Sequence, residues 1–257
     1  MSAKPPFRTP QELAIMREAG RIVAAVLQHM KERVAPGVTT LGLDAAAEET
    51  IRARGGTPAF KGYGPPARPP FPGSICSSVN DVVVHGIPGG RVLREGDIVS
   101  IDVGVEYQGF FGDTAVTLPV GSVSNTARRL LRTCARALEL AIDQVRPGNA
   151  LCQIGETVQE HVEGHGFSVV RDFVGHGIGT AMHQPPEVPN YRTSRCADLV
   201  LEPGLVIAIE PMINAGTHKI KVDADGWTAR TADGELSAHF EHTVAVTPDG
   251  PQILTLL

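Results

Sequence analysis

The sequence predicts an α+β fold made of two similar halves, and three observations support this prediction. A helix, a Pro-Gly turn and a second helix occur twice, with the turns at residues 36–37 and 147–148. A glycine followed by an apolar strand and a carboxylate also occurs twice, at residues 96–102 and 204–210. The length of 257 residues suits a single hydrophobic core. We therefore expect one domain over residues 1–257, with pseudo-repeats at about 9–120 and 124–257 and a site between them.

Four helices are predicted. The first begins after Thr9, because Thr9, Pro10 and Glu12 have the pattern of a capping box with proline at the first helical position. Hydrophobic periodicity, with glycine or Pro-Gly stops, predicts three more helices, at about residues 41–54, at about 126–145 and in a segment ending near 163.

The clearest strands are residues 98–105 and 110–118, which a short turn joins into a hairpin. Alternation along the first strand places Asp102 on the opposite face from its apolar neighbours. If the turn is a two-residue loop at 107–108, Asp102 lies directly opposite Asp113, with Cβ atoms about 5 Å apart. Like charges in such contact repel, so we expect a cation between them.

The second half repeats this anomaly. Glu210 ends an apolar run before Pro211, and Glu241 lies inside strand material. Four buried carboxylates without partners would each cost several kcal/mol, and few lysines or arginines are near them in sequence. A pair of divalent cations bridged by the carboxylates accounts for the pattern.

Several histidines are candidates for the same site. His176 is flanked by glycines that allow close backbone approach, which favours a metal-ligand role. His161 and His165 have helical spacing, but glycines break the helix there, and we expect a solvated helix end. From the sequence alone, His85 and His183 are equally consistent with structural and functional roles.

The composition excludes several function classes. The net charge is −5, and no Lys/Arg cluster indicates a nucleic-acid binder. No apolar run approaches the ~18 residues of a membrane span, and the first residues lack a secretory signal. The four cysteines, Cys76, Cys134, Cys152 and Cys196, are scattered and form no CxxC motif. We therefore expect a protein of the reducing cytoplasm without disulfides or a cysteine-based zinc site.

The segments that carry the acidic residues and the candidate histidines together resemble the type I methionine aminopeptidases. These are metallopeptidases of the pita-bread (creatinase/aminopeptidase) fold. The match covers essentially the whole chain and rests on five motifs in order: VVHGIP, SIDVGVEYQGFFGDTA, GHGIG, AIEPMI and SAHFEHTVAV. The resemblance implies two pseudo-two-fold halves around a curved, mostly antiparallel sheet. It also implies metal-dependent removal of N-terminal methionine from newly made proteins and peptides, with a preference for a small second residue.

The resemblance further implies the site residues. The positions of the metal ligands are Asp102, Asp113, His176, Glu210 and Glu241. Those of the catalytic, substrate-contacting histidines are His85 and His183, and those lining the methionine pocket are Phe60, Tyr63, Cys76, Met182 and Trp227. The sequence departs from the family pattern in two places: residues 64–73 form a longer, proline-rich loop, and Met182 replaces the usual aromatic.

The hypothesis for the mechanism is hydrolysis by a hydroxide that two metal ions activate. Asp113 and Glu241 would bridge the ions, and Glu210 would also act as catalytic proton shuttle. An oxygen-rich ligand set is compatible with Co, Mn, Fe or Zn. The resemblance also indicates a monovalent cation near Asn80 and Ser237, which could equally be ordinary loop residues.

The expected partners are nascent polypeptide N-termini, at the ribosome, with no direct nucleic-acid binding, no membrane association and a monomeric state. One alternative is a proline-specific dipeptidase or aminopeptidase, which usually carries an extra N-terminal domain; here only about eight residues precede the first helix. The other alternative is a non-catalytic protein on the same scaffold that contacts ribosomes or RNA. Such proteins lose metal ligands, whereas all five positions are filled here.

Overall fold

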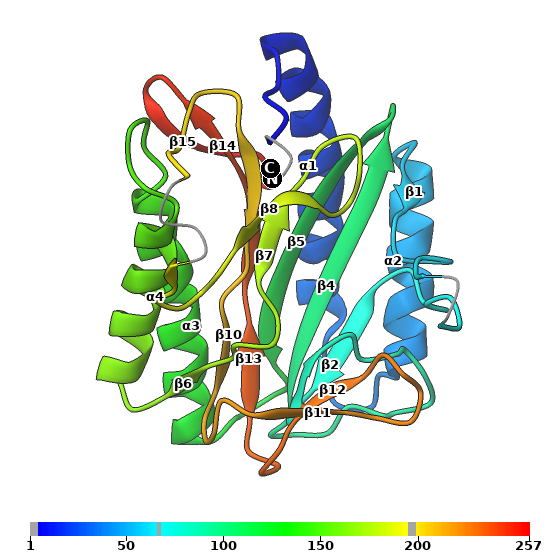
Figure 1. Ribbon diagram of the computed structural model, residues 1–257. Coiled ribbons are helices and arrows are strands. Elements are labelled where there is room, and N and C mark those ends of the chain that lie inside the picture. The colour runs from blue at the N-terminus through cyan, green and yellow to red at the C-terminus, as the bar shows by residue number, and fades with distance from the viewer. Residues whose placement is uncertain (1–4, 66–67, 195–198) are drawn as a thin grey trace.

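The computed structural model describes residues 5–65, 68–194 and 199–257, and a long curved sheet runs through its centre (Figure 1). Four helices of the described residues pack beside this sheet: α1 (Pro10–Arg33), α2 (Thr40–Ala53), α3 (Asn125–Asp143) and α4 (Cys152–Gly164). Thr9 and Glu12 form the predicted capping box at the start of α1. The four predicted helices are therefore confirmed, with bounds shifted by a few residues.

The main sheet has nine strands in the described residues, and each pair is antiparallel. The order is β1-β4-β5-β14-β9-β7-β8, with β2 paired to β4 and β15 paired to β14. The bounds are β1 Thr57–Pro58, β2 Cys76–Val79, β4 Ile98–Tyr107, β5 Phe110–Pro119, β7 Gly175–Gly177, β8 Gln184–Val188, β9 Val206–Ile209, β14 Glu241–Thr247 and β15 Gly250–Ile253.

Two three-stranded sheets lie beside the main sheet. One has the order β13-β10-β6 and the other the order β11-β12-β3. Their bounds are β3 Val82–Val84, β6 Ser168–Val169, β10 Met212–Asn214, β11 Ile220–Val222, β12 Ala229–Thr231 and β13 Ser237–His239.

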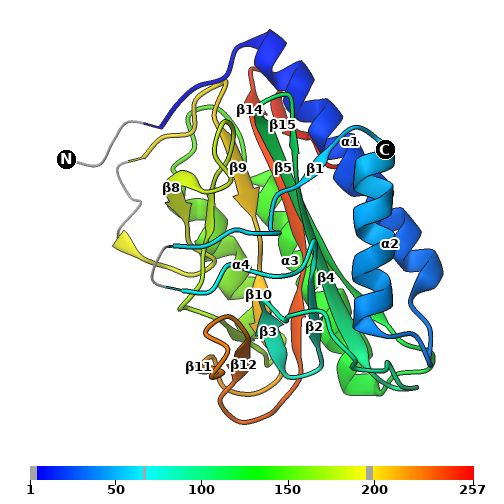
Figure 2. The same cartoon turned by 90° about the vertical axis from the view of Figure 1, so that its right-hand side faces the viewer.

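The predicted duplication appears as a pseudo-two-fold arrangement about the β5–β14 contact. β4 flanks β5 on one side, β9 flanks β14 on the other, and each half adds a helix pair (Figure 2). Ile101 and Val103 on β4 pack with apolar residues of α1 and α2. Ile207 and Val244 pack with those of α3 and α4. The helices thus cover one face of the sheet, and the other face is left for the carboxylates.

The register of the β4–β5 hairpin differs from the prediction. The two-residue loop is Gln108–Gly109, where φ is 50° and 82°, because a turn that matches strand twist needs positive φ at both positions. Asp113 therefore pairs with Gly104, and Asp102 pairs with Ala115. The direct Asp102–Asp113 pairing was wrong. The two carboxylates still share a face, as diagonal neighbours two residues out of register.

Among the described residues, no helix combines the length and apolar character needed to cross a lipid bilayer.

Candidate metal centre and active site

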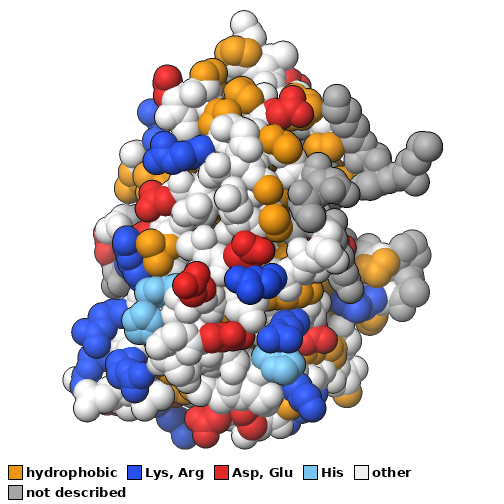
Figure 3. Space-filling model, turned by 60° about the vertical axis from the view of Figure 1, so that its left-hand side comes forward, with side chains coloured by type: hydrophobic (Ala, Val, Ile, Leu, Met, Phe, Trp, Pro, Cys, Tyr) orange, Lys and Arg blue, Asp and Glu red, His pale blue; other side chains and the backbone are white. Residues whose placement is uncertain are grey.

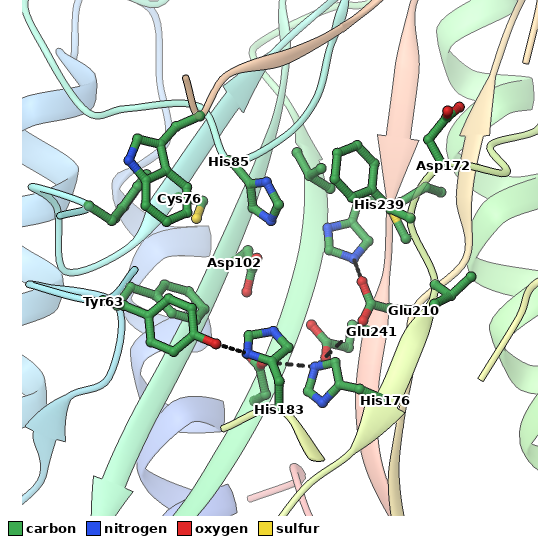
Figure 4. A pocket seen from close by; sticks show the side chains of 18 residues that line it. Tyr63, Cys76, His85, Asp102, Asp172, His176, His183, Glu210, His239 and Glu241 are labelled. Atoms are coloured by element: carbon green, nitrogen blue, oxygen red, sulfur yellow. Dashed lines mark hydrogen bonds and ion pairs between the residues drawn. The ribbon is translucent and has the colours of Figure 1, made fainter. Parts of the chain in front are cut away.

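A cavity of about 260 Å³ lies on the sheet face away from the helices, where the two halves meet. One wall comes from the N-terminal half, with Asp102 on β4 and Asp113 on β5. The opposite wall comes from the C-terminal half, with Glu210 after β9 and Glu241 at the start of β14. Figure 4 shows Asp102 of one half and Glu210 and Glu241 of the other turned toward this common space. The fold thus brings together four acidic residues, of which the first and last, Asp102 and Glu241, are 139 positions apart in the sequence.

His176 joins the acidic residues. Its Nε2 atom lies 3.8 Å from Oδ2 of Asp113 and 3.6 Å from Oε1 of Glu210. One ligand atom from each of Asp113, His176 and Glu241 can be chosen so that all lie within 4.8 Å of one another, a spacing that suits a shared metal ion. The His176 Nδ1 atom faces the Gly177 carbonyl oxygen at 3.0 Å. If Nδ1 donates its proton there, Nε2 is left unprotonated toward the acidic residues, as in many metal-ligating histidines.

Burial determines the electrostatics of the cluster. It raises the pKa of Asp102 to about 7. Burial, followed by repulsion from neighbouring carboxylates, raises the pKa values of Asp113, Glu210 and Glu241 well above the usual range. Burial lowers the pKa of His176 to about 3, so its imidazole is neutral. No lysine or arginine is among the described residues that line the cavity, so the negative charge has no side-chain counter-ion there.

The donor set fits a divalent cation. Three carboxylate oxygens are buried without a hydrogen-bond donor: Oδ1 of Asp102, Oδ1 of Asp113 and Oε1 of Glu241. Buried anionic oxygens are strongly unfavourable unless a donor or cation satisfies them. Carboxylates with one neutral imidazole are ligands that transition-metal ions accept. This donor set is therefore suited to a metal ion.

Hydrogen bonds between β5 and β14 hold the backbone of the two central acidic residues, Asp113 and Glu241. The Thr243 hydroxyl donates to the Asp113 carbonyl oxygen (2.8 Å) and accepts from the Asp113 N–H (3.1 Å). The Thr114 hydroxyl donates to the Glu241 carbonyl oxygen at 2.7 Å. On the other side, the buried Asn190 amide donates to the Glu210 carbonyl oxygen at 3.0 Å. These contacts fix the backbone from which the acidic side chains project.

His183 and His85 both line the cavity. The Tyr63 hydroxyl lies 2.7 Å from Nδ1 of His183, whose ring is 4.2 Å from that of His176. His85 has φ of 59° and packs edge-on against Phe173 and Trp227. Burial lowers the pKa of both histidines, that of His85 to about 4.

Four of the five predicted pocket residues line the cavity: Phe60, Tyr63, Cys76 and Trp227. Met182 is buried behind them, where a Cβ atom at Gly104 would contact both Met182 and Phe60. Burial raises the pKa of the Cys76 thiol, which keeps it protonated and apolar.

The proline-rich loop at 64–73 contributes to one wall of the pocket. Its Pro69 carbonyl oxygen accepts a hydrogen bond from the Trp227 indole at 2.8 Å. Its Phe71 packs edge-on against Trp227, and the Arg68 guanidinium lies 4.7 Å from that ring. Residues 66 and 67 of this loop lie outside the described residues.

His239 was not among the predicted site residues. This buried residue lines the cavity, and its Nε2 atom lies 3.7 Å from Oε2 of Glu210 without a hydrogen bond. The signal was available, because His239 is two residues before Glu241 and spacing of two in extended chain gives a common face. Phe173 and Asp172 also line the cavity and were not predicted.

The remaining candidates lie elsewhere. The Asn80 side-chain amide donates to Asp97 and its side-chain oxygen accepts from the Ile98 N–H. The Asn80 main-chain carbonyl oxygen accepts from the Ser237 N–H. The proposed monovalent-cation position there stays a prediction. The rings of His161 and His165 lie 4.3 Å apart and tilted by 45° at the end of α4, with His165 exposed. Cys196 lies outside the described residues, and the other three cysteines are free thiols.

Comparison with known proteins relates this geometry to one family. Residues 14–248 match the model of "Metallopeptidase family M24". The chain is 48% identical over 248 residues to methionine aminopeptidase 1 of Bacillus subtilis, covering 96% of this chain and 98% of that protein. It superposes on the methionine aminopeptidase of Thermotoga maritima with a TM-score of 0.95 and 42% identity, covering 99% and 100% of the two chains. A Xaa-Pro dipeptidase from Bacillus anthracis shares the fold at a TM-score of 0.78 and 22% identity, with 97% and 61% coverage.

Proposed function

This chain belongs to metallopeptidase family M24 and, within it, to the methionine aminopeptidases, and on this premise we propose its reaction: removal of the N-terminal methionine from newly made proteins and peptides. A small second residue in the substrate is preferred. The observation that carries the proposal is the cluster of buried, unpaired carboxylate oxygens beside an apolar pocket. The cluster suits a metallopeptidase, and the pocket suits an unbranched thioether side chain.

The residues that would hold the metal are Asp102, Asp113, His176, Glu210 and Glu241. We propose that this set would hold two divalent ions, with Asp113 and Glu241 contributed by the adjacent central strands. The ligand chemistry allows Co, Mn, Fe or Zn. When bound, such ions would supply positive charge that polarises the first peptide carbonyl and lowers the pKa of the attacking water.

The protein's own groups then orient the substrate and move protons. The Glu210 carboxylate accepts a proton from the attacking water and passes it toward the leaving amine. If the Tyr63 hydroxyl donates to Nδ1 of His183, the Nε2 proton of that ring is free to stabilise the developing oxyanion. His85, neutral because burial lowers its pKa to about 4, orients the peptide and assists the leaving amine.

Phe60, Tyr63, Cys76 and Trp227 provide apolar or polarizable surface for the methionine side chain. Met182 supports Phe60 from behind, where the family pattern has an aromatic. Selectivity for methionine in this proposal follows from the size of this pocket.

A competition assay tests the function. Purified, metal-loaded protein is incubated with equal amounts of Met-Gly-Met and Leu-Gly-Met, and the released amino acids are quantified. We expect methionine release to dominate, because a branched side chain fills the narrow pocket less well. Equal rates would refute the methionine assignment. A Leu-Pro dipeptide serves as control for the alternative, proline-specific activity and should remain intact.

The proposal extends to the domain organisation, the location and the oligomeric state of the protein. We propose that residues 1–257 form a single catalytic domain that acts as a cytoplasmic monomer on nascent chains at the ribosome. We expect no direct nucleic-acid binding, since the net charge is −5 and both acidic and basic side chains occur on the face shown in Figure 3. We also propose a structural monovalent cation near Asn80 and Ser237.

A further inference from the structure

We propose that Arg8, in the segment before α1, is a positioning residue for His183. Its buried guanidinium holds the β7–β8 hairpin so that His183 faces the cavity. The inference rests on the proposed function, because it concerns the role assigned there to His183.

The Arg8 side chain is buried among elements that are distant in sequence. Only 6% of it is exposed, and its Nη2 atom donates to Oε1 of Gln184 at 3.1 Å. The guanidinium also packs against Gly179, at a position where any Cβ atom would overlap it. Glu12 lies 3.9 Å from Nη1, and the Phe110 ring lies 5.8 Å from the guanidinium carbon.

The backbone of Arg8 is also tied down. Its N–H donates to the Gly204 carbonyl oxygen at 2.7 Å, in the turn that precedes β9. Gly204 has φ of +94°, and a Cβ atom there would lie 2.9 Å from the Arg8 carbonyl oxygen. The N-terminal segment therefore lies against both the turn before β9 and the β7–β8 hairpin, and Arg8 is where the two contacts meet.

The residue that Arg8 contacts is the direct neighbour of His183 in the chain. Gln184, which accepts from Arg8, begins β8 and directly follows His183. Successive side chains of an extended chain point to opposite sides. The Gln184 amide accordingly reaches Arg8, whereas His183 reaches the cavity and the Tyr63 hydroxyl. A shift of Gln184 would therefore displace His183.

The hairpin needs such support because of its place in the sheet. β8 is at one end of the strand order and pairs with β7. Two backbone hydrogen bonds attach the connecting residues to the rest of the sheet, from Ile178 N–H to the Val206 carbonyl and from Phe111 N–H to the Gly179 carbonyl. Arg8 adds a side-chain hydrogen bond to this hairpin at Gln184.

An arginine is an unfavourable choice for stability alone at this position. Its Nε atom is buried without a hydrogen-bond partner, and its contact to Glu12 is long. Burying an incompletely paired cation costs free energy that an apolar side chain of similar volume would not. A directional hydrogen bond to Gln184 is what the guanidinium provides and an apolar side chain does not.

The first test uses metal-free protein and does not depend on catalysis. Hydrogen–deuterium exchange is compared for the wild type, Arg8→Met, Arg8→Lys and the control Arg21→Met, which alters an exposed ion pair on α1. We expect Arg8→Met to accelerate exchange in residues 178–184 without changing β4 or β14. Arg8→Lys, which keeps a donor, and Arg21→Met should resemble the wild type. Unchanged protection of residues 178–184 in Arg8→Met would overturn the proposal.

The second test measures Met-Gly-Met cleavage by metal-loaded protein. We expect Arg8→Met to lower kcat by about 10- to 100-fold, the scale of a misplaced catalytic group, with KM, metal affinity and Tm near wild type. Gln184→Met should cause a similar loss, and the double variant should add little, since both act through one contact. Additive losses, or a loss that follows metal affinity, would indicate a merely structural role and overturn the proposal. Wild-type protein that cleaves nothing would refute the proposed function, whereas the exchange experiment would still decide the role of Arg8.

Discussion

The two halves of the sheet have similar topology but deliver different chemistry to the cavity. In the N-terminal half, Asp102 and Asp113 project from β4 and β5, two regular strands of ten residues each. In the C-terminal half, β9 has only four residues, and Glu210 follows it at the break before Pro211. Three of the four histidines that line the cavity also come from this half: His176, His183 and His239.

The contrast has a physical origin. A continuous antiparallel ladder holds side chains at fixed spacing, so the N-terminal half supplies carboxylates in a rigid arrangement. Proline cannot donate to a ladder, so Pro211 interrupts the strand and leaves Glu210 outside regular pairing. The Cys134 thiol donates to the Pro211 carbonyl oxygen at 3.3 Å and supports this break from α3. We infer that both halves hold the metal and contact the substrate, and that the second half also supplies the proton shuttle Glu210.

The largest effect should come from the central pair, which belongs to both halves equally. Asp113→Asn and Glu241→Gln should each reduce metal affinity more than about 100-fold, because removing a direct ligand should exceed the ~10–100-fold cost of losing an outer-shell partner. Peptidase activity should fall to background. Equilibrium dialysis with metal analysis measures the affinity. A large loss in only one variant would show that the halves do not share the metal centre.

Asp102 and Glu210 occupy equivalent positions in the two halves and should differ in their effect. Glu210→Gln should lower kcat by about 100- to 10,000-fold, the range for losing a general acid–base group, even at metal concentrations that saturate the site. Asp102→Asn should act mainly through weaker metal binding, with turnover recovering at high metal concentration. Steady-state kinetics across a metal titration separates the two effects. Near wild-type turnover in Glu210→Gln would contradict its proton-shuttle role.

Metal binding should stabilise the fold by linking both halves. At a metal concentration of 100 Kd, binding contributes about 2.7 kcal/mol to the free energy of unfolding. For a chain of this size the corresponding rise in Tm is about 5–10 °C. Thermal unfolding of metal-free protein with and without Mn²⁺ measures the shift, and Asp113→Asn provides the control without it. A wild-type Tm that does not change when Mn²⁺ is added would argue against a metal centre between the halves.

The smallest effect concerns packing between the halves. Gly104 on β4 leaves the space that Met182 and Phe60 occupy, and a Cβ atom there would lie 2.5 Å from the Met182 methyl carbon. Gly104→Ala should destabilise the protein by about 1–3 kcal/mol through overpacking. Chemical denaturation measures this change. Gly104→Ala in a Met182→Ala background should cost less, and an equal cost in both backgrounds would exclude this contact as the cause.

Local patterns were sufficient to predict the helices and the acidic positions. The capping box at Thr9, the Pro-Gly turns and the carboxylates within apolar strands all depend on neighbours in sequence. The hairpin register was harder, because a shift of one residue in the loop moves every cross-strand partner. His239 was missed although its spacing of two from Glu241 was visible, because its contact with Glu210 joins residues 29 positions apart along the chain.

The sequence by itself indicated which side chains could bind a cation, because carboxylates buried among apolar strand residues are costly without a counter-ion. It also determined the duplicated order of helices and strands. Only the tertiary structure decided that Asp113 and Glu241 meet across β5 and β14, that Met182 lies behind the cavity and that Arg8 reaches the His183 turn. The reason is that these contacts join segments far apart in sequence, and their distances depend on how the two halves pack rather than on any local pattern.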